Sequence, residues 1–147
     1  PVLYPMTAVL DVEGCYRVTH VDAPEEAPAS SRDTDPLWEA AHQARQIAEE
    51  RLDREAGASR GRVAIIVGAQ RARAWGADVD GDSALSERVA LLSANATKGL
   101  EFDSVVLVEP GEIMSDGVGD LFVALTRATH DVHVVHAAAL PAGMEEW

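Results

Sequence analysis

The chain has 147 residues, the size of one domain, and 47% of them are hydrophobic, which suffices for one buried core. A single cysteine, Cys15, excludes an internal disulfide, and no apolar run of about eighteen residues could span a membrane, so we expect a cytoplasmic protein. The formal net charge is −13, so the surface as a whole repels nucleic acid, and any contact with it is local or made by other parts of a larger protein.

The first part of the chain, residues 1–35, has an irregular pattern. Short strands are expected at residues 2–4 and 15–21, the second on the alternation of its side chains. Residues 22–35 collect prolines, serines and acids, which predicts a solvated and partly disordered loop. The chain begins without Met, which indicates a piece of a longer protein.

A long helix is predicted next. Asp35 can accept the free N–H groups of its first turn, Pro36 suits that turn, and Gly57 is the expected stop. The other face of this helix is polar and needs no functional role. The apolar face expected to be buried consists of Leu37, Ala40, Ala41, Ala44, Ile47, Ala48 and Leu52.

Four apolar segments predict strands. Residues 63–67, 89–92 and 105–108 are apolar without alternation, which is typical of strands covered on both faces. Residues 132–135 are interrupted by His133, which predicts a strand near the edge of the sheet.

Helical segments separate these strands. Leu121, Ala124, Leu125 and Ala128 mark one face of a helix, and residues 71–87 predict a loop with a short helix. Strands that alternate with helices predict an α/β fold, a parallel sheet flanked by helices. We expect a single domain over residues 1–147.

One candidate site is the loop from Ser93 to Asp103, which follows a predicted strand. In an open parallel sheet, ligands bind beyond the carboxyl ends of the strands. Lys98 and the backbone N–H groups of this loop could bind phosphate, and Glu101 could bind a sugar hydroxyl. The alternative is a connecting loop whose charged side chains face water, and composition alone favours it.

The second candidate, also expected beyond the carboxyl end of a strand, is the segment from Leu121 to Ala128, where Arg127 is the one strong cation on an apolar predicted helix. An arginine there could stabilise charge on a transferring phosphoryl group. The alternative is an ion pair between Arg127 and an acid such as Asp131 or Glu101, and spacing alone favours this pairing.

Several other sites are excluded or not expected. No G-x-x-x-x-G-K-[ST] phosphate loop occurs in the chain, and no serine or cysteine has the setting of a nucleophile elbow. His130, His133 and His136 stand three apart, but on a strand such residues point to alternate faces, so no metal site is expected.

Two motifs resemble those of known helicases. The run Thr97–Asp103, followed by an apolar strand, resembles motif V of superfamily-one DNA helicases of the UvrD, Rep and PcrA type. The run Phe122–Ala128 resembles their motif VI, and the order and separation of the two runs match as well. The resemblance spans residues 63–137 and identifies the motif-bearing core of the domain.

The resemblance implies the second, C-terminal RecA-like lobe of a helicase, without the phosphate loop. ATP with Mg²⁺ would lie between this lobe and an N-terminal RecA-like lobe, which would hold the phosphates and the metal. Arg127 would be the arginine finger, the residue in the catalytic role, and Glu101 would contact the ribose. The residues implied at the nucleotide are Lys98, Gly99, Glu101 and Thr126, and those implied at single-stranded DNA are Ser93 and Asn95.

Two departures point to one branch of this family. Asn95 replaces the usual His, and Val118, Gly119 and Asp120 stand where basic residues often precede motif VI. With the acidic composition, these changes resemble the branch of HelD, a helicase-like protein associated with RNA polymerase.

Three hypotheses follow. The first is the motor lobe of an ATP-dependent DNA helicase or translocase, inactive as an isolated fragment. The second is a polymerase-binding factor that docks through its acidic surface, although the acidity could also serve solubility alone. The third is a scaffold without a nucleotide site, against which Lys98, Gly99, Glu101 and Arg127 argue.

Overall fold

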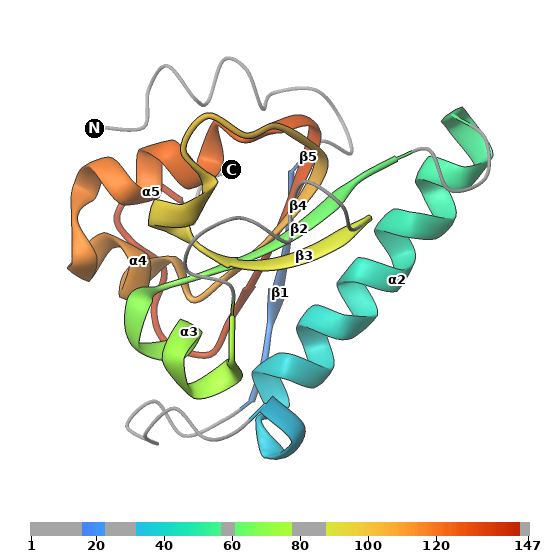
Figure 1. The fold of residues 1–147 in the computed structure, drawn as a ribbon. Helices are drawn as coiled ribbons and strands as arrows, with labels where there is room; N and C mark the ends of the chain where they lie inside the picture. Colours follow the sequence, from blue (N-terminus) through green and yellow to red (C-terminus); the bar gives the residue numbers. More distant parts are fainter. Residues whose placement is uncertain (1–15, 23–31, 57–60, 78–87, 145–147) are drawn as a thin grey trace.

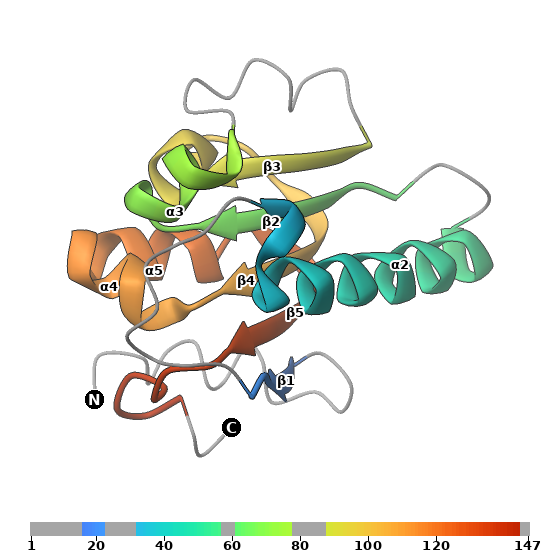
Figure 2. The same cartoon turned by 90° about the horizontal axis from the view of Figure 1, so that it is seen from below.

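The computed structural model describes residues 16–22, 32–56, 61–77 and 88–144. Its centre is a five-stranded sheet with the order β1-β5-β4-β2-β3, in which every pair of neighbours is parallel (Figures 1 and 2). The predicted α/β class, a parallel sheet flanked by helices, is therefore confirmed. The strands are β1 (Tyr16–His20), β2 (Val63–Val67), β3 (Val89–Ser93), β4 (Phe102–Val108) and β5 (Ala128–His136).

Helices cover both faces of the sheet. The long helix α2 packs on one face, and α5 packs on the other (Figure 1). None of the helices in the described part of the chain is long and apolar enough to cross a membrane. The helices are α2 (Pro36–Ala56), α3 (Ala69–Trp75), α4 (Pro110–Asp116) and α5 (Val118–Leu125), with 3-10 turns η1 (Arg32–Thr34) and η3 (Ala94–Thr97).

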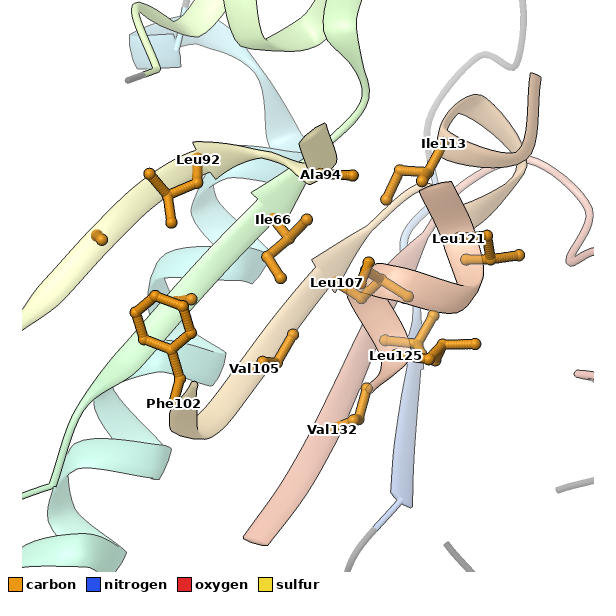
Figure 3. Packing of buried hydrophobic residues seen from close by; sticks show 14 of the residues in the cluster. Ile66, Leu92, Ala94, Phe102, Val105, Leu107, Ile113, Leu121, Leu125 and Val132 are labelled. Carbon is orange, nitrogen blue, oxygen red and sulfur yellow. The ribbon is translucent and has the colours of Figure 1, made fainter. Parts of the chain in front are cut away.

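The core lies in two layers, one on each side of the sheet. In β2, Ala64 and Ile66 belong to the layer under α5, whereas Val63, Ile65 and Val67 belong to the layer under α2. Figure 3 shows the first layer, where strand side chains meet those of α4 and α5. Because both faces are covered, an apolar residue is stabilised at every position, which explains the apolar runs without alternation.

Helix α2 begins and ends where the sequence predicts. The Asp35 carboxylate accepts a hydrogen bond of 2.9 Å from the Leu37 N–H, so Asp35 caps the helix. The helix ends at Ala56, one residue before the predicted stop, and Gly57 itself lies outside the described residues.

The buried stripe of α2 is narrower than predicted. Leu37, Ala41, Ala44, Ala48 and Leu52 are buried as expected. Ile47 was expected on this face but is 47% exposed, since it lies beside the stripe rather than on it. Alanines dominate the stripe, and their small side chains allow the helix to lie close to the sheet.

The remaining predicted elements match in part. Strand β1 covers most of the predicted 15–21, and β5 lies next to the edge strand β1, as the interruption of residues 132–135 indicates. The predicted strand at 2–4, most of the loop at 22–35 and the end of the loop at 71–87 lie outside the described residues.

The predicted helix over Leu121–Ala128 is too long. Helix α5 ends at Leu125, and Ala128 is the first residue of β5. The Thr126 N–H closes the last turn on the carbonyls of Phe122 and Val123, at 3.1 Å each. Arg127 therefore lies in the turn between the helix and the strand.

Candidate functional site

The two helicase-like segments meet at the amino end of the sheet. The chain that follows η3 runs back from the end of β3 to the start of β4, and α5 likewise leads to the start of β5 (Figure 1). There the Phe102 N–H donates a 2.8 Å hydrogen bond to the Arg127 carbonyl. The residues Lys98 to Glu101 and Thr126 to Arg127 are thus brought to the same edge, although they are far apart in sequence.

This placement corrects an expectation. We expected both segments beyond the carboxyl ends of strands, but of their candidate side chains only those of Ser93 and Asn95 lie at such an end, in the last residue of β3 and in η3 directly after it. The reason is the parallel order, since each connection must return to the amino end before the next strand begins. Arg127 and Glu101 each stand one residue before a strand and are therefore at the amino end.

Arg127 is held by oxygen atoms of its own chain. Its Nε donates to the Val123 carbonyl at 3.1 Å, and its Nη1 donates to the Leu100 carbonyl at 3.3 Å. Its Nη2 donates to the Thr126 hydroxyl at 3.2 Å. A guanidinium has five N–H donors, so one N–H on each terminal nitrogen is left for another acceptor.

No acid among the described residues forms an ion pair with Arg127. Asp131, one acid proposed as its partner, instead forms an ion pair with Arg51 and accepts a hydrogen bond from Ser104. Glu101, the other, is exposed. The predicted ion pairs of Arg127 with Asp131 and with Glu101 are therefore not formed, and within the described part of the chain carbonyl oxygens orient the charge of Arg127.

The start of the first segment is shaped by local hydrogen bonds. Ser93 is 7% exposed, and its hydroxyl accepts a 3.4 Å bond from the Ala96 N–H, which caps η3. The buried Thr97 hydroxyl donates to the Ala94 carbonyl at 2.6 Å. Gly99 has a φ of 80°, a conformation that favours glycine. A Cβ on Gly99 would meet nothing within 4 Å, so this backbone angle, and not crowding, calls for glycine.

Three further candidate side chains, those of Asn95, Lys98 and Glu101, are exposed. None makes a hydrogen bond or an ion pair with the described part of the chain that would hold it in one place. Their geometry is compatible both with a ligand and with water, so the two alternatives for this loop both stand. The packing of η3 against α5 links this loop to the helix that precedes Arg127.

At the carboxyl end of β2, acidic residues of α4 contact the start of α3. The Asp116 carboxylate of α4 accepts a 2.8 Å bond from the Ala69 N–H at the start of α3. A Cβ on Gly68 would stand 3.3 Å from that carboxylate and from Glu112, so α4 fits tightly here. An N–H group that could bind phosphate is thereby already paired with an acid.

A buried charge cluster that no local sequence pattern predicts lies at the same end of the sheet. The Arg71 side chain is 5% exposed and donates to Asp35 at 2.6 Å and to both oxygens of Glu112 at 2.8 Å. Burial acts to lower the pKa of Arg71, but Glu112 and Asp35 outweigh it and raise that pKa above its ordinary value. Trp75 completes the cluster, since its Nε1 donates to Asp35 at 3.1 Å.

A third polar region lies between α2 and β5. His133 makes a 2.7 Å hydrogen bond with Thr19, near the pair formed by Arg51 and Asp131. Burial lowers the pKa of His133, and the charges of Arg17 and Arg51 lower it further. The described residues contain no group of three or more His, Cys, Asp or Glu placed to hold a metal ion.

No family model and no curated protein matches the chain. Among solved structures, the chain is similar to the C-terminal domain of a possible DNA helicase from Lactobacillus plantarun WCFS1. The two are 21% identical, the match covers 88% of this chain and 76% of that one, and the TM-score is 0.50. At this identity the likeness is one of fold, so the chain has a fold similar to that of a helicase C-terminal domain.

Proposed function

We propose that the chain is the C-terminal motor lobe of an ATP-dependent DNA helicase or translocase, and that Arg127 is its arginine finger. The observation that carries the proposal is the setting of Arg127. Its charge is oriented by carbonyl and hydroxyl oxygens, and no acid in the described part of the chain neutralises it. The likeness in fold to a helicase C-terminal domain supports the same lobe.

The chemistry of phosphoryl transfer suits this setting. Negative charge spreads over the phosphoryl oxygens in the transition state, and a correctly placed arginine stabilises it by a factor of about a thousand or more in rate. Arg127 has one unused N–H on Nη1 and one on Nη2, and a bidentate contact with an oxyanion requires two N–H donors. Arginine stays charged at any physiological pH, so no proton transfer is required of it.

The rest of the ATP site would come from an N-terminal RecA-like lobe of the same protein. The chain contains no phosphate loop, so the phosphates and Mg²⁺ would be bound mainly by that lobe. In this proposal the exposed Lys98 and Glu101 reach the nucleotide, with Glu101 at the ribose. The isolated lobe would not turn over ATP, since closure of the two lobes must bring Arg127 to the phosphate.

Of the two residues proposed to contact single-stranded DNA, Asn95 is more accessible than Ser93. Asn95 is exposed, whereas Ser93 is 7% exposed and its hydroxyl caps η3. With a net charge of −13, the lobe would add local contacts to DNA that other parts of the full-length protein bind. A cytoplasmic location fits this role.

The proposal is tested by ATP turnover of the full-length protein, unaltered and with Arg127→Ala, with and without single-stranded DNA. We expect Arg127→Ala to lower kcat by about a thousandfold or more. The matched control is Arg73→Ala, which removes an exposed arginine from α3 and should leave turnover unchanged. Normal turnover by the Arg127→Ala protein would refute the arginine finger.

The acidic composition supports a second candidate, a HelD-like factor that binds RNA polymerase through this lobe. Binding of the full-length protein to single-stranded DNA and to RNA polymerase, each measured against salt, separates the two candidates. Tight, salt-sensitive DNA binding with DNA-stimulated turnover supports the motor. Polymerase binding without DNA binding supports the factor.

A further inference from the structure

Thr126 lies between the end of α5 and the guanidinium of Arg127. Its hydroxyl donates a 2.9 Å hydrogen bond to the Val123 carbonyl and accepts a 3.2 Å bond from Nη2 of Arg127. The same Val123 carbonyl also accepts from Nε of Arg127 at 3.1 Å. These bonds form a closed ring that connects the arginine to the last turn of the helix.

The single hydroxyl hydrogen of Thr126 limits what this side chain can bind. A hydroxyl carries one hydrogen and two lone pairs, and the Thr126 hydrogen is used by the Val123 carbonyl. Phosphate oxygens of ATP are acceptors and need a donor. In this arrangement Thr126 therefore has nothing to offer a phosphate directly, whereas its lone pair already supports Arg127.

We infer that Thr126 is a positioning residue, whose hydroxyl holds the Arg127 guanidinium in the orientation that presents its two remaining N–H groups. This inference rests on the proposed function of Arg127 as an arginine finger. It replaces the direct nucleotide contact that the motif resemblance implies for Thr126. Thr126 acts on the reaction only through Arg127.

The energetic reason is pre-organisation. An arginine side chain has several rotatable bonds, and fixing them during the reaction costs free energy that pre-formed hydrogen bonds remove. The bond from Nη1 to the Leu100 carbonyl fixes the plane from the side of the loop, at 3.3 Å. Without the Thr126 oxygen, Nη2 has no ligand among the described residues, and only the bonds of Nε and Nη1 hold the guanidinium.

The test is Thr126→Val in the full-length protein, because valine keeps the shape of threonine and removes only the hydroxyl. We expect kcat for ATP to fall about tenfold or more, since hydrogen bonds to charged groups are among the stronger ones, while KM stays unchanged. Thr126→Ser restores the hydroxyl and should return kcat to within about threefold of the unaltered value. The matched control is Thr129→Val. The Thr129 hydroxyl donates a 3.4 Å hydrogen bond to the Phe102 carbonyl and forms none with Arg127.

A double variant shows whether Thr126 acts through Arg127. In the Arg127→Ala background, Thr126→Val should cause no further loss, because the group that it positions is absent. An equal loss in both backgrounds would overturn the inference, as would normal kcat for Thr126→Val alone.

The failures of the two proposals are distinguishable. If Arg127→Ala abolishes turnover and Thr126→Val does not change it, the arginine finger stands and the positioning role falls. If Arg127→Ala turns over ATP normally, the proposed function falls, and the positioning role falls with it. A loss in Thr126→Val that Thr126→Ser does not repair would identify a packing defect and overturn the role of the hydroxyl.

Discussion

Two arginines at opposite ends of the sheet are held in contrasting ways. Arg71, at the carboxyl end, is 5% exposed and bonded to the carboxylates of Asp35 and Glu112. Arg127, at the amino end, is bonded to two carbonyls and a hydroxyl. Carboxylates neutralise a guanidinium, whereas carbonyl dipoles orient it and leave its net charge in place.

The contrast distinguishes Arg71, which stabilises the fold, from Arg127, which has N–H donors available for a ligand. The cluster of Arg71 connects α3 to α4 and to the residue that caps α2, so its bonds serve the fold. The hydrogen bonds of Arg127 connect the end of α5 to the loop at Leu100 and leave two of its N–H donors unused. The surroundings of a cation therefore indicate its role better than its burial does.

The largest expected effect on stability comes from Arg71→Met. This change leaves the buried Asp35 without its cation, and breaking a buried pair costs about 3 kcal/mol or more in the free energy of unfolding. Urea unfolding measures the loss. The matched change, Arg127→Met, removes hydrogen bonds to uncharged oxygens but breaks no ion pair among the described residues, so it should cost less than Arg71→Met. Equal losses in the two variants would contradict the contrast between the arginines.

A smaller effect is expected from Asp116→Ala at the same end of the sheet. The change removes the acceptor of the Ala69 N–H, and the loss of a capping group costs about 1 kcal/mol in the free energy of unfolding. Urea unfolding is again the measurement, with Ser115→Ala as a control at an exposed neighbour on α4. An unchanged stability of Asp116→Ala would show that this acid does not hold α3 to α4.

The smallest effect concerns pH and His133, whose cationic neighbours lie on the α2 side of the sheet. Its pKa is lowered in the folded state from the ordinary 6.5, so below that pH the unfolded chain binds a proton that the folded chain lacks. This contribution to stability is complete above 6.5 and is lost as the pH falls through the folded pKa.

His133→Gln should therefore reduce the loss of stability on acidification, measured by urea unfolding at about pH 7.5 and about pH 5.5. The control is His130→Gln, since the His130 side chain is 57% exposed on the same strand. The same loss on acidification in His133→Gln and in the unaltered protein would show that His133 does not contribute.

Local patterns predicted the fold well, because the sheet is covered on both faces. The apolar runs of β2 and β3 and the cap of α2 at Asp35 depend only on neighbouring residues and appear as expected, whereas β4 begins at Phe102, three residues before the predicted strand and inside the predicted loop. The end of α5 was misjudged, since Ala128 continues the apolar spacing of the helix but pairs with Phe102 in the sheet. Spacing alone does not show where a helix yields to a strand.

The candidate site was less predictable than the fold. The motif resemblance singled out Arg127 and Thr126, but their mutual hydrogen bond is visible only in the structure. The end of the sheet at which they lie depends on the path of the connections. The partners of Arg71 come from α4 and from the residue before α2, and no local pattern reports such a distant contact.

The pairing of β1 has a consequence for the order of folding. Tyr16, near the start of the described chain, pairs with Val132, close to its end, and α2 carries the chain across the face of the sheet in between. During synthesis β1 therefore remains without its partner β5 until all the other strands have been made. Pairings between such distant segments slow folding, so the docking of β1 onto β5 should be a late step that completes the edge of the sheet.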